Sequence, residues 1–148
     1  MRIDDRVEHL VREALHWVVK RDAESLDAAL AAFVDEKTRR ESLELLVAVA
    51  GFVLIDLHQG RPNHAQVQVV AEKVAHMEAW ANITSDEVAV FMNAILAGRS
   101  LAEDLRTEDV VVLAFVVAGS LLSSRELPEG QWWFDYLDQV EAAIEAAG

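Results

Sequence analysis

The sequence predicts an all-α protein, a single-domain bundle of about seven helices in which the helices at about 38–59 and 108–124 are central and amphipathic helices surround them. Apolar residues recur every three or four positions along most of the chain, as they do on one face of a helix. Only two prolines and six glycines interrupt the 148 residues, which favours long helices joined by short turns. The chain is 53% hydrophobic, enough for one domain with a substantial core.

The first three helices follow from this spacing and from capping residues. We expect helices over 4–21 and 23–34, the second with Asp22 as its N-cap. Thr38 and Glu41 have the spacing of a capping box, so the third helix is expected to begin there. It should run to residue 59, with Gly60 as a left-handed stop.

The remaining helices are expected at 63–81, 85–98, 108–124 and 129–147, with a short helical turn at 100–105. Asn63 and the pair Thr84 and Glu87 provide N-terminal caps. Residues 110–117 are rich in β-branched side chains, so a buried strand is the alternative there. No second segment has the pattern of a partner strand, which favours the helix.

Two of these helices differ from the others in their hydrophobic pattern. Residues 45–55 and 110–122 are apolar on every side of a helical projection. A helix that is apolar on every side is buried on every side. We therefore expect these two helices to form the centre of the bundle.

Composition excludes several classes of protein. There is no cysteine, so disulfides, thiolate metal sites and a cysteine nucleophile are ruled out. The longest apolar runs, Leu45–Ile55 and Val110–Leu122, are shorter than the roughly 20 residues that span a bilayer. Four of the five residues at positions 2–6 are charged, where a secretion signal would be apolar, and we expect a cytoplasmic protein that has no cofactor.

The net charge of −13 bears on the partners of the protein. A surface of this sign repels the phosphates of nucleic acids and anionic membranes, so neither is expected to bind. The simplest interpretation is an acidic surface that keeps the protein in solution, and the alternative is a surface for a basic protein partner.

The segment from Asp56 to His64 is the candidate ligand site, with Asp56, His58, Arg61 and His64 as its binding residues. It follows a buried helix, and polar groups at such an end often line a pocket. A histidine there can act as acid or base near neutral pH, and Arg61 can hold an anion. The alternative is structural, since a histidine in the last turn is favoured by the helix dipole.

Glu13 and His16 have the Glu-x-x-His spacing of helical di-iron proteins. That chemistry needs the motif on two helices, and here it occurs once, so we expect no metal site. Together with His9, these residues project away from the apolar face of their helix. They are expected to face solvent or a partner.

Three consecutive aromatic residues, Trp132, Trp133 and Phe134, lie near the start of the last helix. Trp133 projects inward, whereas Trp132 and Phe134 flank it and are the predicted interface residues. Exposed tryptophan is enriched at protein interfaces. The alternative is that neighbouring helices cover both flanks.

The function that these features favour is a non-enzymatic protein-interaction or regulatory module, in its simplest form a homodimer. The first alternative is a small-molecule-binding domain with a pocket near the end of the 38–59 helix. The second is an enzyme that uses the segment Asp56–His64 for acid–base chemistry, which requires His58 and His64 to share a cavity. A third is an acidic mimic of a nucleic acid.

Overall fold

The computed structural model describes residues 1–101, 105 and 107–148, and over these residues the secondary structure is helical. The expected all-α fold is confirmed, including a helix rather than a strand at 110–117. The expected turn at 100–105 falls largely outside the described residues. The elements are α1 (Asp5–Val19), α2 (Ala23–Leu30), α3 (Glu36–His58), α4 (His64–Met77), the short 3-10 helix η1 (Ala79–Ala81), α5 (Ser85–Ala97), α6 (Thr107–Ser124) and α7 (Trp133–Ala146).

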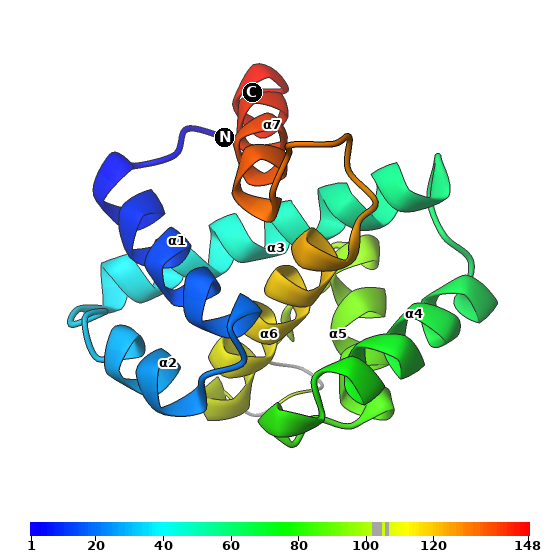
Figure 1. The fold of residues 1–148 in the computed structure, drawn as a ribbon, viewed down its shortest axis with the longest axis horizontal. Helices are drawn as coiled ribbons and strands as arrows, with labels where there is room; N and C mark the ends of the chain where they lie inside the picture. The colour runs from blue at the N-terminus through cyan, green and yellow to red at the C-terminus, as the bar shows by residue number, and fades with distance from the viewer. Residues whose placement is uncertain (102–104, 106) are drawn as a thin grey trace.

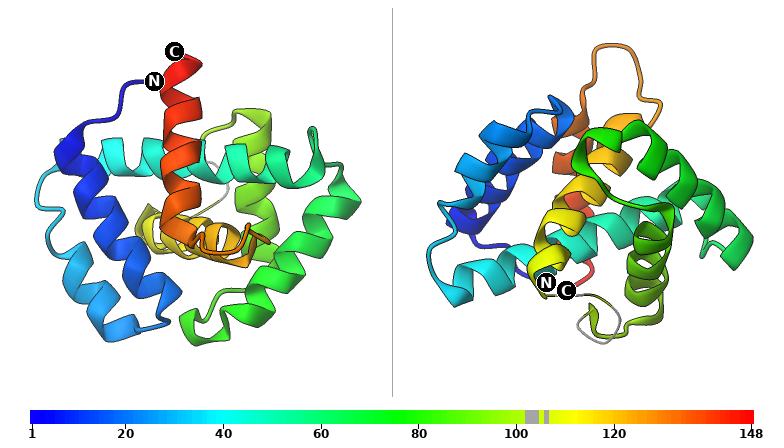
Figure 2. Two further views of the ribbon diagram at one scale, coloured as in Figure 1. Left: turned by 45° about the horizontal axis from the view of Figure 1, so that its top comes forward. Right: turned by 90° about the horizontal axis from the view of Figure 1, so that it is seen from below.

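The helices surround α6, which passes through the middle of the molecule (Figure 1). Helices α1 and α2 lie on one side of it, and α4 and α5 lie on the other. Helix α3 runs behind these helices across the width of the molecule (Figure 1). Helix α7 crosses α3 between its two ends (Figure 2). The two ends of the chain lie side by side, and the Ile3 amide donates to a Glu145 carboxylate oxygen at 3.4 Å.

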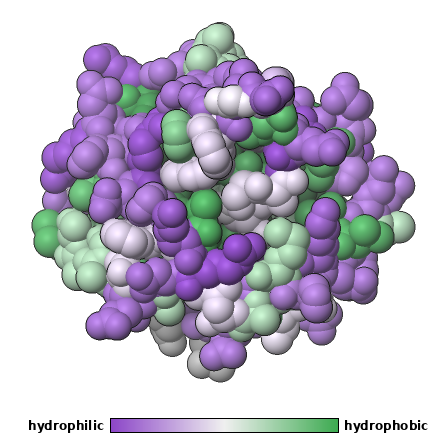
Figure 3. All heavy atoms as spheres, in the orientation of Figure 1, coloured by the Kyte–Doolittle hydropathy of each residue, from purple (hydrophilic) through white to green (hydrophobic). Residues whose placement is uncertain are grey.

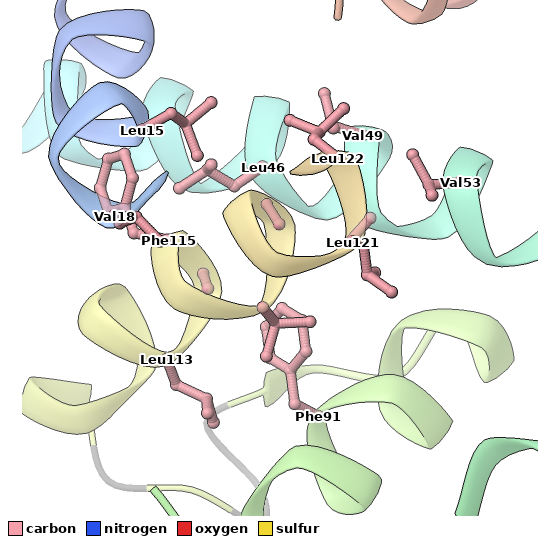
Figure 4. Close-up of a cluster of buried hydrophobic side chains, with 14 of the residues drawn as sticks. Leu15, Val18, Leu46, Val49, Val53, Phe91, Leu113, Phe115, Leu121 and Leu122 are labelled. Atoms are coloured by element: carbon pink, nitrogen blue, oxygen red, sulfur yellow. The ribbon is translucent and has the colours of Figure 1, made fainter. Parts of the chain in front are cut away.

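The prediction of two central helices agrees with the burial of α6 and of the middle of α3. All residues from 113 to 122 in α6 are buried. Side chains of α1, α3 and α5 converge on α6, among them Leu46 and Phe91 (Figure 4). The last turns of α3 differ from the expectation, because Ile55 and Leu57 are 47% and 40% exposed. Helix α3 extends beyond the helices that cover its middle, so its apolar end meets solvent.

Both ends of α3 differ from the sequence prediction. The N-cap is Asp35, whose carboxylate accepts a hydrogen bond from the Thr38 amide at 2.7 Å. Thr38 is therefore inside the first turn, buried, and its hydroxyl accepts from Arg6 at 2.8 Å instead of capping the helix. At the other end Gln59, with φ of 55°, takes the left-handed conformation that was expected of Gly60.

Three other helices are shorter than predicted by four or five residues. Helix α2 ends at Leu30 rather than at 34. Helix α4 ends at Met77 because the backbone of Glu78 leaves the helical region. The buried carboxylate of Glu78 accepts hydrogen bonds from Trp80 at 2.9 Å and from Ser120 at 3.0 Å. Helix α7 begins at Trp133 rather than at 129. Its first turn is capped by Asp135, whose carboxylate accepts a hydrogen bond from the Trp132 amide.

The caps expected at Asp22, Asn63 and Thr84 are confirmed, and the last two form complete capping boxes with Gln66 and Glu87. These residues satisfy amides that a helix N-terminus would leave unpaired.

On the face shown in Figure 3, hydrophobic residues appear in small groups among hydrophilic ones. Among the described residues, no helix is long and apolar enough to cross a membrane.

Candidate functional site

The structure divides the predicted ligand residues among three environments. Asp56 belongs to an ionic cluster at the junction of α3 with α6 and α7. Its Oδ2 accepts from Arg125 at 2.9 Å and from the Tyr136 hydroxyl at 2.6 Å. Burial, followed by the hydrogen bond to Asp56, raises the pKa of Tyr136 to about 12. The Arg125 guanidinium also lies over the Tyr136 ring, 5.6 Å from its centre. Asp56 thus fixes the chain after α6 onto α3.

His58 lies beside a hollow of about 330 Å³ whose other walls come from α4 and α6. Its Nδ1 is 2.7 Å from the Leu54 carbonyl oxygen. Because a carbonyl only accepts, this contact makes Nδ1 the donor and leaves Nε2 for another partner. His58 therefore has both predicted features. It is a hydrogen-bonded histidine in the last helical turn, and it lines a hollow.

Arg61 and His64 line a different hollow, of about 480 Å³, next to the end of α5. His58 does not line it. The acid–base hypothesis requires His58 and His64 to face one cavity, and the structure does not bring them together. We therefore do not propose this chemistry.

A third hollow, of about 380 Å³, lies between α1 and the start of α7. Its aromatic walls are Trp17 from α1 and Trp133 and Phe134 from α7. Trp133 and Phe134 meet edge to face, with ring centres 5.8 Å apart. Phe134 is 41% exposed and the preceding Trp132 is 65% exposed, as expected from the sequence, although Trp132 does not line this hollow.

The polar residues of the same hollow are His9, Arg12, Glu13 and His16, all from α1. The sequence predicted that His9, Glu13 and His16 face away from the core, and the structure agrees in placing them on this surface. His16 packs edge to face on Trp17, with ring centres 4.7 Å apart. Glu13 is exposed and makes no hydrogen bond or ion pair within the described part of the chain. Among the described residues, no group of three acidic or histidine side chains is placed to hold a metal ion.

Arg12 joins α1 to α7 and was not identified from the sequence. Its guanidinium contacts Glu8 at 2.8 Å, Asp138 at 2.7 Å and Glu141 at 3.2 Å. The only available signal was the i,i+4 spacing of Glu8 and Arg12, which is common on helix surfaces. Three carboxylates around one guanidinium leave the α1–α7 junction with an excess of negative charge.

Glu141 is the perturbed group of this cluster. Burial raises the pKa of its carboxyl to about 7, and the neighbouring carboxylates of Glu8 and Asp138 add to the rise. Arg12 opposes this shift but does not overcome it, and Oε2 of Glu141 is buried with no hydrogen-bond partner.

Replacing Glu141 by glutamine should therefore stabilise the protein at high pH. The folded pKa of Glu141 is above its ordinary value of 4.5, so the stability it contributes is complete below about pH 4.5 and is lost as pH rises through about 7. We expect Glu141→Gln to raise the free energy of unfolding by about 1–3 kcal/mol at pH 8, a figure discounted for partial solvent access, and to have little effect at pH 4.5. Urea unfolding at several pH values measures the difference.

The control is Glu24→Gln, which removes one carboxylate from an exposed position on α2. The difference in the free energy of unfolding between Glu24→Gln and the wild type should not change between pH 4.5 and pH 8. If Glu141→Gln also showed a constant difference, the raised pKa would be refuted.

Comparisons with known protein families, with curated proteins and with solved structures found no match for this chain.

Proposed function

We propose that this protein is a non-enzymatic interaction module that docks a basic segment of a partner protein on the hollow between α1 and α7. The observation that carries the proposal is the combination of aromatic walls from two helices with the unpaired carboxylate of Glu13 in one hollow. Lysine or arginine side chains are the protein groups that this chemistry favours.

The aromatic side chains supply the first part of the attraction. A lysine or arginine cation is attracted to the face of a tryptophan or phenylalanine ring, by about 0.5–1 kcal/mol at exposed sites and more where water is excluded. Trp17, Trp133 and Phe134 offer such rings from two helices. Exposed aromatic side chains also lose unfavourable contact with water when a partner covers them.

The charges supply the second part. Arg12, the one lysine or arginine among the residues of the hollow, is already held by Glu8, Asp138 and Glu141. Glu13 has no such partner and can pair with an incoming cation. The net charge of −13 adds a long-range attraction that speeds the approach of a basic partner.

Electrostatics favour a different chain over a second copy of this one. In a homodimer built on this face, the Glu13 and Asp138 carboxylates of both copies would be brought together, and like charges at an interface are unfavourable. A basic partner meets no such repulsion. Light scattering of the wild type and of Trp132→Ala tests the homodimer separately.

Binding of a fluorescein-labelled peptide of alternating lysine and alanine tests the proposal, with anisotropy as the readout. Phe134→Ala and Glu13→Gln should each weaken binding by roughly three- to tenfold, because each removes one attraction of about 0.5–1.5 kcal/mol. A peptide with glutamate in place of lysine should not bind.

The matched controls are Glu24→Gln, which changes the net charge as Glu13→Gln does, and Val69→Ala, which truncates an apolar side chain that is 66% exposed on α4. Both should bind the lysine peptide as the wild type does. If Glu24→Gln weakened binding as much as Glu13→Gln, net charge alone would explain the attraction and the proposed site would be wrong.

A further inference from the structure

The hollow beside His58 has a different chemistry from the one between α1 and α7. It is lined by residues from the last turn of α3, from α4, and from the end of α6 and the residue that follows it. Its volume, about 330 Å³, is within the lower part of the range for small-molecule sites, roughly 300–1,000 Å³. Most of its wall is apolar. The apolar side chains are Leu57 from α3, Val69, Val70, Val74 and Met77 from α4, and Leu121 from α6.

Two of these apolar side chains are incompletely covered. Leu57 is 40% exposed and Val69 is 66% exposed, although most large apolar residues of the described chain are inside the core. Removing such surface from water is favourable in proportion to its area. An aliphatic ligand in the hollow would bury both side chains.

The charged residues of this hollow are all basic. His58 lines it from α3, Lys73 from α4 and Arg125 from the chain just after α6, and no aspartate or glutamate is among the described residues of its wall. The chain as a whole has 26 acidic residues against 13 lysines and arginines. A wall that has the cation of Lys73 and no carboxylate among its described residues is therefore opposite in sign to the protein as a whole, and this favours an anionic ligand.

Two of the basic groups have a donor available. Lys73 is exposed and makes no hydrogen bond or ion pair within the described residues. His58 uses Nδ1 toward the Leu54 carbonyl, so Nε2 is the ring nitrogen left for a ligand, and it donates a hydrogen bond only in the doubly protonated ring. Arg125 is paired with Asp56 at 2.9 Å, so its charge is largely offset, and among the described residues Lys73 is the unpaired cation of the hollow.

We infer that this hollow binds a small amphipathic organic acid, an unbranched aliphatic chain that ends in a carboxylate. The aliphatic chain lies on the apolar wall between α4 and Leu121, and the carboxylate pairs with Lys73 and His58. This site is separate from the α1–α7 hollow and does not depend on the proposed protein partner.

Isothermal titration calorimetry with octanoate, octanol and octylamine tests the inference, because the three share one aliphatic chain and differ in charge. Octanoate should bind saturably and at least tenfold more tightly than octanol, and octylamine should not bind. Across butanoate, hexanoate and octanoate, each added CH₂ that is buried should strengthen binding by about fourfold. Equal affinity for octanoate and octylamine, or affinity independent of chain length, would overturn the proposal.

Variants of the protein locate the site. Lys73→Gln and His58→Gln should each weaken octanoate binding by roughly three- to tenfold, as expected for loss of one charge-assisted hydrogen bond. Val69→Glu should abolish it, because it replaces exposed apolar surface with a carboxylate. All three positions are exposed or half-buried, so thermal unfolding should show folded proteins.

The matched control is Lys20→Gln, which removes the same charge from an exposed position at the end of α1. Lys20→Gln and Phe134→Ala should bind octanoate as the wild type does. If Lys20→Gln lost as much affinity as Lys73→Gln, or if the wild type bound no octanoate, the assignment of this hollow would be wrong. Weaker lysine-peptide binding in Phe134→Ala with octanoate binding unchanged would confirm two independent sites.

Discussion

Phe115→Ala should lower the free energy of unfolding by about 3–5 kcal/mol, the typical cost of deleting a buried phenylalanine ring. Phe115 is 0% exposed on α6, and its ring meets Phe33 edge to face with centres 5.7 Å apart. The close-up in Figure 4 places it beside Leu15 and Val18 of α1. The lost ring leaves a cavity that helices on several sides cannot all close. Urea unfolding measures the loss, and thermal unfolding should show a decrease of roughly 10 °C in Tm.

Phe134→Ala provides the same chemical change at the surface. Because Phe134 is 41% exposed, its truncation should cost about 1 kcal/mol or less. The pair separates stability from binding: Phe115→Ala should unfold readily, whereas Phe134→Ala should stay folded and bind the lysine peptide more weakly than the wild type does. Equal losses of stability in the two variants would contradict the central position of α6.

Gly119→Ala should destabilise the protein by about 1–3 kcal/mol, even though alanine is the better helix former. A Cβ at position 119 would lie 2.5 Å from Cγ1 and 3.0 Å from Cβ of Val18. The absence of a side chain therefore allows α1 to approach α6 closely. The added methyl group would force the two helices apart, and thermal and urea unfolding would both record the loss.

Gly51→Ala is the control, since a Cβ there would have no atom within 4 Å. In this middle position of α3 it should stabilise the protein by about 0.5–1 kcal/mol through helix propensity alone. Val18→Ala should partly rescue Gly119→Ala, so that the double variant is more stable than the sum of the single effects predicts. A stabilising Gly119→Ala would refute the close contact between α1 and α6.

Much of the helical architecture could be predicted from local pattern. The apolar run of α6 indicated burial on every side, and the N-cap at Asn63 and the capping box at Thr84 marked two helix starts within one residue. Such signals lie within a few residues of one another, so they are visible in the sequence. The predicted start of α3 was wrong. Thr38 and Glu41 have the spacing of a capping box, but Asp35, three residues earlier, is the N-cap of the helix.

The candidate sites were predicted less completely. The sequence identified His58 and the exposed aromatic pair of Trp132 and Phe134, but it grouped His64 with His58 when they line different hollows. It also gave no indication that Lys73 and Arg125 lie beside His58. His58 belongs to α3, Lys73 to α4 and Arg125 to the segment after α6, and their meeting depends on how the helices cross.

By itself, the sequence determined that this chain folds as helices, which helices are central, and that its surface is acidic. Those properties follow from periodicity, composition and short-range capping, each of which acts over a few residues. The tertiary structure alone decided that Arg12 joins α1 to α7, that Trp17 and Trp133 line one hollow, and that Lys73 and Arg125 lie near His58 at the end of α3. Such contacts join residues far apart in the chain, and helix packing angles, which local pattern does not encode, bring them together.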